Sequence, residues 1–188
     1  FIALNDGSTL NTIQCVVDFE KFDENLLKQI NTGAALKITG TLVESQGRGQ
    51  SVEIKVNNIY VHGTADPETY PIQPKKHSLE FLREKAHLRI RTNTFAAVMR
   101  VRSALSFAIH QYFRDNGFYY FHAPIITGSD AEGAGEMFRV TTLDNKNPPL
   151  TKEGAVDYKK DFFGKETNLT VSGQLEAEAY AMALGKVY

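Results

Sequence analysis

The feature that most constrains this chain is a long amphipathic helix pattern that stops at a glycine and leads at once into an aromatic run ending in proline. Apolar residues recur at helical spacing through residues 95–113, which predicts a helix with one buried face. Asn116 and Gly117 end this helix, because glycine accepts the left-handed conformation that a C-cap usually needs. The run 118–122 suits a β-strand, and Pro124, which has no amide proton, belongs at a strand end or at a sheet edge open to a partner chain. The apolar residues of the expected helix face are Phe95, Val98, Met99, Leu105, Ile109, Tyr112 and Phe113.

A glycine-rich acidic segment, 127–136, follows this unit. Its carboxylates are Asp130, Glu132 and Glu136. Such a segment can move and carry negative charge, but it is not a phosphate-binding P-loop, because no Gly-Lys-Ser or Gly-Lys-Thr follows. A polar excursion, 144–165, comes next, and we expect its Phe162–Phe163 pair to dock onto the domain.

A strand-to-helix junction near the end of the chain is the best candidate for a small-ligand site. The β-prone run 167–171 leads into a helix for which Ser172 is the expected N-cap, and Gly185 ends that helix. Gln174 and Glu178 then lie at the mouth of the junction, where polar side chains can face a ligand. The alternative is that these side chains are ordinary solvated residues of a helix surface.

The first 63 residues predict a small β-barrel. Four β-prone runs occur, with one short helix between the second and the third. The expected strands are 1–5, 9–18, 36–44 and 52–61, and the helix begins after Asp23. An OB-fold barrel has five strands and a helix between the third and the fourth, so we expect an OB fold whose first strand lies before Phe1.

Phe1 and Gln14 are the candidate nucleic-acid contacts of this barrel. They come from neighbouring expected strands, and OB barrels often bind single-stranded nucleic acid by stacking bases on aromatic side chains. The alternative is that Phe1 belongs to the core and that Gln14 is simply solvated. From the residues alone, this alternative is the stronger interpretation.

Composition excludes several classes of protein. With 188 residues and 42% hydrophobic content, the chain can hold one ordinary domain or two small ones. Its net charge of -1 gives no overall attraction to nucleic acid, so any such contact needs a local cluster. Cys15 is the only cysteine and the five histidines lack paired ligand spacing, so we expect no disulfide, no metal site and a cytoplasmic location. No apolar run is long enough to span a bilayer, so we expect no membrane contact.

Residues 64–93 predict an extended connector between two domains. Prolines at positions 67, 71 and 74 lie among polar residues, and the densest basic cluster of the chain follows them. The cluster consists of Arg83, Lys85, Arg89 and Arg91. It is either a solvated face or a contact for RNA phosphates, and the sequence leaves both open. The expected domains are therefore 1–63, 64–93 and 94–188.

Several segments resemble the class II aminoacyl-tRNA synthetases. The run from Gly117 to Pro124-Ile125-Ile126 resembles their motif 1, and GSDAEGAGEMF and TVSGQLEAEAYAMALG are similar to the aspartyl and asparaginyl branch. The resemblance implies an α+β chain, in which an OB-fold anticodon-binding domain precedes the first part of an antiparallel-sheet catalytic domain. It also implies a homodimer formed around Gly117 and Pro124, with Phe1 stacked on an anticodon base and Gln14 bonded to a base edge.

The same resemblance implies an amino-acid site. Glu132 is expected to bind the α-amino group, and Ser172 and Gln174 the backbone of the amino acid. Glu178 is expected to accept the side-chain amide, and Ala177 stands where the aspartyl branch has a lysine that pairs with the substrate carboxylate. Loss of that cation and repulsion by Glu178 together favour asparagine over aspartate.

The reaction implied by the resemblance has two steps and uses ATP and Mg²⁺. Asparagine is activated to its adenylate and then transferred to tRNA(Asn). Motifs 2 and 3, which hold ATP in this class, are expected beyond Tyr188, so we expect this stretch to be an inactive fragment. Two alternatives stay open: an aspartyl enzyme, including its non-discriminating form, and a non-catalytic paralogue whose OB module binds nucleic acid.

Overall fold

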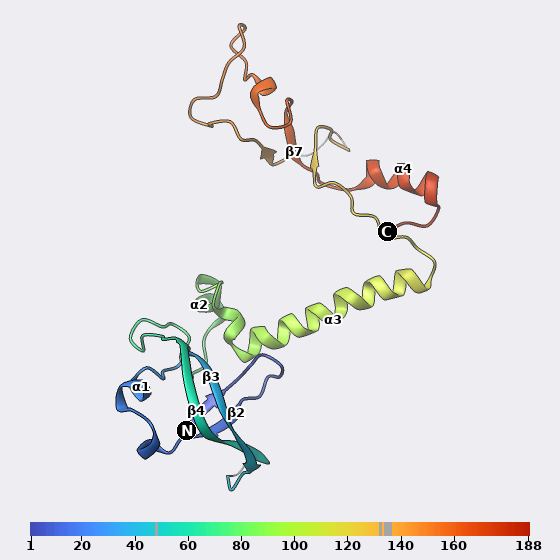
Figure 1. Ribbon diagram of the computed structural model, residues 1–188. Coiled ribbons are helices and arrows are strands. Elements are labelled where there is room, and N and C mark those ends of the chain that lie inside the picture. The colour runs from blue at the N-terminus through green and yellow to red at the C-terminus, as the bar shows by residue number, and fades with distance from the viewer. Residues whose placement is uncertain (48, 132, 134–136) are drawn as a thin grey trace. The chain divides into compact units, whose positions relative to one another are not determined.

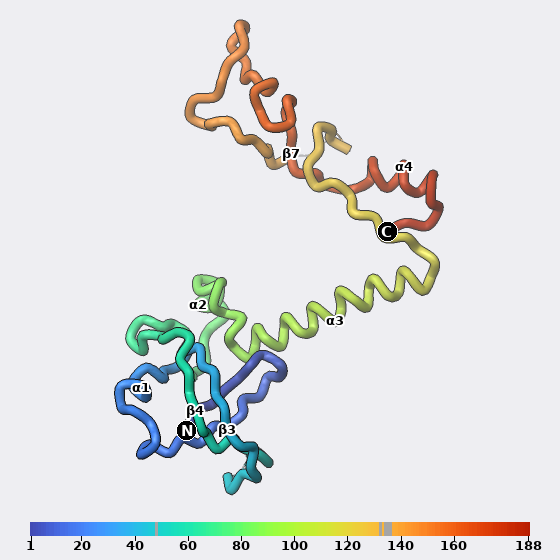
Figure 2. The backbone as a smooth tube through the Cα atoms, viewed as in Figure 1, coloured from blue at the N-terminus to red at the C-terminus, as the bar shows by residue number. Residues whose placement is uncertain are grey.

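The computed structural model describes residues 1–47, 49–131, 133 and 137–188. It divides into two compact units, residues 1–104 and 105–188, which are described one at a time (Figures 1 and 2). Helix α3 (Asn93–Asp115) contributes its first part to one unit and its second part to the other. The expected division at residues 63 and 93 stays a prediction.

The first unit contains a four-stranded sheet. Its strands are β1 (Ile2–Leu4), β2 (Ile13–Val16), β3 (Ala35–Glu44) and β4 (Val52–Gly63). The order is β1-β2-β4-β3, in which β2 and β4 run parallel and the other neighbours antiparallel (Figure 1). Four strands with a helix between the second and the third confirm the pattern expected from the sequence.

The core of this unit lies on one face of the sheet. Cys15, Val56 and Ile59 are buried there, and burial raises the pKa of the Cys15 thiol. The spacing between Val56 and Ile59 departs from simple alternation because the β3–β4 register shifts between Thr39 and Gly40. A side chain at Gly40 would meet the Lys55 carbonyl oxygen at 2.4 Å, so the irregular pairing there requires glycine.

Short helices close the first unit. They are η1 (Phe19–Lys21), α1 (Glu24–Lys28), α2 (Leu79–Glu84) and η2 (Arg89–Arg91). Asp23 caps α1 as expected, because its carboxylate accepts the amides of Asn25 and Leu26. Ser78 caps α2 in the same way. The buried side chain of Leu82 in α2 shows that the expected connector is packed rather than extended at this point.

Helix α3 ends as the sequence predicts. Gly117 has a φ of +78°, its amide donates to the Arg114 carbonyl at 3.0 Å, and the Phe118 amide donates to the Phe113 carbonyl at 3.0 Å. The Phe113 and Phe118 rings also meet, with centroids 5.3 Å apart. These two hydrogen bonds and the apolar contact define a Schellman motif, which requires the left-handed glycine.

The expected burial of one α3 face is wrong for the described chain. Val98, Leu105, Ile109 and Tyr112 are 50% to 65% exposed. No residue of α3, which is described throughout, is buried. Helical periodicity predicted an apolar face correctly, but burial requires a segment packed along that face, and the described residues cover it only in part, at the half-buried Phe95 and Phe113.

The expected strand 118–122 is also not formed. The structure places a single parallel bridge there, between Tyr119 and Val187. The Tyr119 amide donates to the Lys186 carbonyl at 2.9 Å, and the Tyr188 amide donates to the Tyr119 carbonyl at 3.1 Å. The backbone is extended, as aromatic residues favour, but a strand also needs a longer partner than these few residues.

The second unit holds a small antiparallel sheet. Its strands are β5 (Ile126–Thr127), β6 (Arg139–Val140) and β7 (Thr167–Leu169), in the order β5-β7-β6. The 3-10 helix η3 (Tyr158–Lys160) lies between β6 and β7, and α4 (Gln174–Leu184) follows β7. The antiparallel sheet confirms the expected α+β class. Among the described residues, no helix combines the length and apolarity needed to cross a membrane.

Candidate functional site

The junction between β7 and α4 brings two predicted site residues together. The Gln174 amide donates to the Ser172 hydroxyl at 3.0 Å, and that hydroxyl lies 3.0 Å from the Gln174 side-chain oxygen, to which it donates. Thr170 fixes the turn before them, because its hydroxyl accepts the Ser172 amide at 3.3 Å and donates to the Ser172 carbonyl at 2.5 Å. Ser172 is half-buried and Gln174 is exposed.

The N-cap of α4 is Gly173, so the expectation that Ser172 would be the cap is wrong. A side chain at Gly173 would lie 3.1 Å from the Ala123 side chain, which leaves little room for any residue but glycine at the helix start. The Ser172 hydroxyl nevertheless satisfies one amide of the first turn, from one position earlier. Gly185 ends α4 as expected, with a φ of +79°.

Gln174, Ala177 and Glu178 share one side of α4. They are separated by three and four residues along a helix, and this spacing places side chains next to one another. Ala177 is half-buried and Glu178 is exposed. The helix is held by the stacked rings of Phe121 and Tyr180, whose centroids are 4.9 Å apart. The arrangement forms a polar row that begins at Ser172 and runs along α4.

The acidic segment 127–136 is described in part. Glu132, the expected ligand of the α-amino group, lies outside the described residues, and so does Glu136. At the start of the segment, a side chain at Gly128 would lie 3.2 Å from the end of the Lys165 side chain, so glycine lets this lysine pass close to the backbone.

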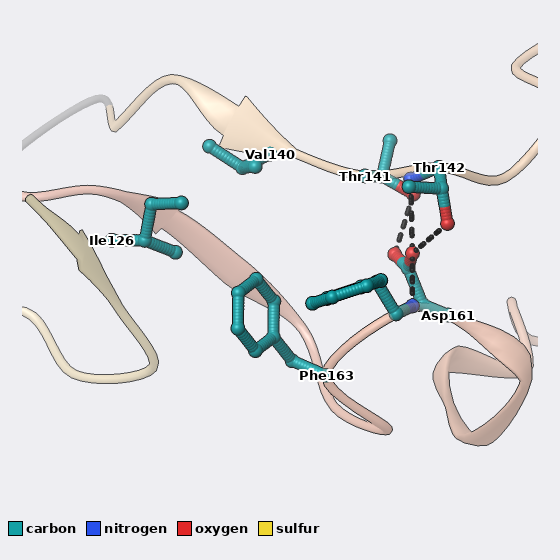
Figure 3. Close-up of a pocket in the computed structure, with 7 residues that line it drawn as sticks. Ile126, Val140, Thr141, Thr142, Asp161 and Phe163 are labelled. Atoms are coloured by element: carbon teal, nitrogen blue, oxygen red, sulfur yellow. Dashed lines mark hydrogen bonds between the residues drawn. The ribbon is translucent and has the colours of Figure 1, made fainter.

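A buried carboxylate that the sequence reading missed anchors the excursion 144–165. Asp161 accepts the Thr141 hydroxyl at 2.5 Å, the Thr142 hydroxyl at 2.8 Å and the Thr142 amide at 2.9 Å (Figure 3). It also accepts the Phe162 amide at 2.7 Å. Hydrogen bonds from Thr141 and Thr142 hold the pKa of Asp161 well below its usual range. The only sequence signal was a pair of threonines after a strand, far from the aspartate along the chain.

Both rings of the Phe162–Phe163 pair line a small hollow together with Ile126 and Val140, so the expected docking is confirmed (Figure 3). The contact is partial, because Phe163 is 48% exposed and Phe162 is 76% exposed. Asp161 therefore fixes the segment, and the two rings supply its apolar contact.

The second candidate site lies on the barrel sheet. Ala3 pairs with Gln14, and Phe1 lies two residues before Ala3, so strand alternation puts Phe1 and Gln14 on the same side. Phe1 is 86% exposed, so it does not belong to the core of the described chain. Gln14 donates to a Glu53 carboxylate oxygen at 3.4 Å.

Glu53 is the residue of this site that the sequence reading missed. The same Glu53 oxygen also accepts a hydrogen bond from the Ser45 hydroxyl at 2.9 Å and one from the side-chain carboxamide of Gln50 at 3.4 Å. Glu53 lies on β4 and Gln14 on β2, and the two strands are neighbours in the sheet. The sequence indicated only that Glu53 alternates with Ile54 on a strand and so points away from the core. The order of the strands in the sheet was needed to show that Glu53 meets Gln14.

The basic cluster makes contacts within the first unit. Arg83 pairs with Glu80 at 3.5 Å, and the Arg89 guanidinium lies 4.6 Å from the centre of the Phe95 ring. Arg91 donates to the carbonyl of a barrel residue. The Arg83–Glu80 pair is exposed and fits the interpretation of the cluster as a solvated face, while contact with RNA phosphates stays a prediction.

Comparison with known proteins identifies the family. Residues 1–61 match the OB-fold nucleic acid binding domain, and residues 78–188 match the class II tRNA synthetases (D, K and N). The chain therefore belongs to the class II tRNA synthetases of the D, K and N group. Within that group it is 65% identical to the asparagine–tRNA ligase of Cytophaga hutchinsonii and 61% identical to that of Porphyromonas gingivalis. Both matches cover all of this chain and 40% of the relative.

Solved structures show the same fold. The asparaginyl-tRNA synthetase of Pyrococcus horikoshii, complexed with asparaginyl-adenylate, matches with a TM-score of 0.74 at 22% identity, over 98% of this chain and 38% of that one. The asparaginyl-tRNA synthetase of Entamoeba histolytica, also in complex with asparaginyl-adenylate, gives 0.72 at 23% identity, over 100% and 39%. These matches confirm the expected combination of an OB fold with a class II synthetase sheet.

Proposed function

We propose that the protein containing this chain is an asparagine–tRNA ligase. The observation that carries the proposal is the identity of 57% to 65% with asparagine–tRNA ligases along the whole chain. The chain spans about 40% of the length of those relatives, so the proposal concerns the activity of a longer protein.

The proposed reaction begins with activation of asparagine by ATP. The asparagine carboxylate oxygen attacks the α-phosphorus, the bond to the bridging oxygen breaks, and pyrophosphate leaves. The terminal ribose hydroxyl of tRNA(Asn) then attacks the activated carbonyl and AMP leaves. Mg²⁺, which synthetases of this class use, would stabilise charge on the phosphates. Among the described residues, no group of three His, Cys, Asp or Glu side chains is placed to hold a metal ion.

The polar row on α4 is proposed to bind asparagine. Ser172 and Gln174 offer a hydroxyl and a carboxamide for the amino-acid backbone, and Glu178 offers a carboxylate to the side-chain amide. A carboxylate attracts an amide donor and repels a second carboxylate, while Ala177 offers no cation to aspartate. Glu132 remains the proposed partner of the α-amino group.

The barrel site is proposed to read the anticodon of tRNA(Asn). The exposed Phe1 ring can stack on a base, which is worth about 1–3 kcal/mol per base in such sites. Gln14 can bond to a base edge from the same side of the sheet, and Glu53 orients its carboxamide.

A homodimer is proposed around α3, Gly117 and Pro124. The apolar face of α3 supports this, because Leu105, Ile109 and Tyr112 are more than half exposed in the single chain. A partner chain would remove this apolar surface from water. Light scattering on the full-length protein tests the assembly, and a strict monomer would contradict it.

A cytoplasmic location is proposed as well. It is supported by the family and by the free thiol of Cys15, and cell fractionation tests it.

Amino-acid-dependent exchange between ATP and pyrophosphate tests the function directly. We expect the full-length protein to catalyse exchange with asparagine and not with aspartate. Exchange with aspartate alone would replace the proposed activity by that of an aspartyl enzyme. Exchange with neither amino acid, together with retained RNA binding, would favour a non-catalytic nucleic-acid-binding protein.

A further inference from the structure

Arg91 joins the connector to the barrel. Its Nη1 donates to the Gly33 carbonyl at 3.3 Å and to the Tyr70 hydroxyl at 3.1 Å. Its guanidinium also lies 5.8 Å from the centre of the Tyr70 ring, within the range of a cation–π contact. Gly33 precedes β3 of the barrel, whereas Tyr70 and Arg91 belong to the segment after it. The Arg91 guanidinium therefore binds both the barrel, at Gly33, and the connector, at Tyr70.

Tyr70 itself fits against the barrel backbone. A side chain at Gly33 would lie 2.6 Å from the Tyr70 ring atoms, so the ring packs where a side chain would otherwise stand. Gly33 also has a φ of +93°, which disfavours any residue but glycine. The close approach of Tyr70 places its hydroxyl beside Arg91.

Arg100 makes a second junction between α3 and the barrel. Its two terminal nitrogens donate to the carbonyls of Gly7 and Ser8, at 2.5 and 3.3 Å, in the turn between β1 and β2. Asn5 holds this turn, because its side chain accepts the Gly7 amide at 2.6 Å and donates to the Asn11 carbonyl at 2.9 Å. The carbonyls are therefore presented to Arg100 by a turn that is already ordered.

We propose that Arg91, Tyr70 and Arg100 form a barrel clamp, and that they are positioning residues for tRNA rather than phosphate ligands. The inference rests on the proposed function, since it assigns the clamp a role in the tRNA-dependent step. A tRNA held at its anticodon by the barrel is presented correctly only if the barrel keeps a fixed orientation on the helices that follow it. The two arginines bind the barrel at two different connections, the turn between β1 and β2 and the residues before β3, so together they restrict rotation as well as separation.

Arg91→Gln and Arg100→Gln in the full-length protein test the clamp, with Lys76→Gln as a control. Lys76 is an exposed cation of the same connector. Tyr70→Phe keeps the ring on Gly33 but removes the hydroxyl that Arg91 binds. Four quantities are measured for each variant: kcat/KM for tRNA, its salt dependence, tRNA-independent ATP–pyrophosphate exchange, and amide hydrogen exchange at residues 5–11 and 31–34.

We expect faster hydrogen exchange at residues 5–11 in Arg100→Gln and at 31–34 in Arg91→Gln. We also expect kcat/KM for tRNA to fall on the order of 10-fold, since an ångström of misplacement can cost about 100-fold. Tyr70→Phe should show a smaller change in the same direction as Arg91→Gln. Pyrophosphate exchange and the salt slope should stay at wild-type values, and Lys76→Gln should keep its hydrogen exchange unchanged.

Two results would overturn the clamp. A salt slope lowered by about one, with unchanged hydrogen exchange, would make the arginine a phosphate ligand. Faster hydrogen exchange with an unchanged kcat/KM for tRNA would leave the contacts without a positioning role. Failure of the proposed function is distinguishable, because it appears as absent asparagine-dependent exchange in the wild type. Hydrogen exchange in the variants would then still show whether the contacts of Arg91 and Arg100 stabilise the barrel segments that they bind.

Discussion

Each unit contains a carboxylate that collects hydrogen-bond donors, and the two carboxylates differ in how tightly they are held. Asp161 is buried and accepts four bonds of 2.5 to 2.9 Å, two of them from backbone amides. Glu53 is half-buried and accepts three bonds, two of which are 3.4 Å long and come from flexible carboxamides. Bonds at 3.4 Å are weak and easily exchanged, whereas short bonds to an ionised group are strong.

The strength of these hydrogen bonds separates a structural anchor from a candidate binding residue. Asp161 has its donors supplied by the fold, so a ligand would have to break strong bonds to reach it. Glu53 holds Gln14 loosely, so the carboxamide can turn away at little cost, as its proposed role in reading a base would require. Glu178 on α4 completes the series, because its carboxylate makes no hydrogen bond or ion pair with any described residue.

Glu178→Gln gives the largest expected effect and tests the free end of this series. The substitution replaces an acceptor by a carboxamide that also carries donors, so an asparagine amide would lose its charged partner. We expect asparagine-dependent pyrophosphate exchange to fall at least about 100-fold in kcat/KM, as for sites built to bond a polar side chain. Glu176→Gln, one position earlier than Ala177 on the same helix, is the control. A loss below about threefold would remove Glu178 from the amino-acid site.

Glu53→Gln tests the intermediate member. We expect kcat/KM for tRNA(Asn) to fall at most about 10-fold, because the 3.4 Å bond that Gln14 loses is weak and worth roughly 0.5–1.5 kcal/mol. Pyrophosphate exchange with asparagine should not change. Glu44→Gln at the exposed end of β3 serves as the control. An equal loss in both assays would mean that Glu53 maintains the barrel and does not orient a reader of the anticodon.

Asp161→Asn tests the anchored member through stability and pH. Because hydrogen bonds lower its folded-state pKa below an unfolded value of about 3.9, the carboxylate stabilises the fold above about pH 4. That stabilisation is lost as the pH falls through the folded-state pKa. We expect Asp161→Asn to lower the melting temperature at pH 7 and to approach the wild type in strong acid. Asp144→Asn, an exposed aspartate of the same excursion, should leave the melting temperature nearly unchanged.

If the melting temperature of Asp161→Asn differed from that of the wild type by the same amount at every pH, the hydrogen bonds would not stabilise the ionised form of Asp161. The contrast with Glu53 would then rest on bond lengths alone.

Local sequence signals predicted what depends on a few neighbouring residues. The Asp23 cap and the Gly117 helix end each follow from one residue and its nearest amides, and both are confirmed. Features that depend on distant partners were missed or wrong. Asp161 meets threonines about 20 residues away, and most of the apolar face of α3 stays exposed. The row on α4 was predicted from the family resemblance, because helix spacing alone does not separate a binding row from a solvated surface.

Gly117→Ala gives the smallest expected effect and tests whether the end of α3 is fixed locally. Nothing lies within 4 Å of a side chain at Gly117, so the only penalty is its φ of +78°. A left-handed alanine costs about 1–2 kcal/mol, and we expect denaturant unfolding to show a loss of that size. Gly63→Ala is the matched control, because the space around Gly63 is also open and its φ is not in the left-handed region. Gly63→Ala should be neutral or slightly stabilising, because alanine restricts the unfolded chain. An equal loss in both variants would mean that the left-handed conformation of Gly117 is not the cause. A loss for Gly117→Ala alone, with asparagine-dependent exchange intact, would show that the left-handed glycine of the Schellman motif stabilises the fold without acting on asparagine activation.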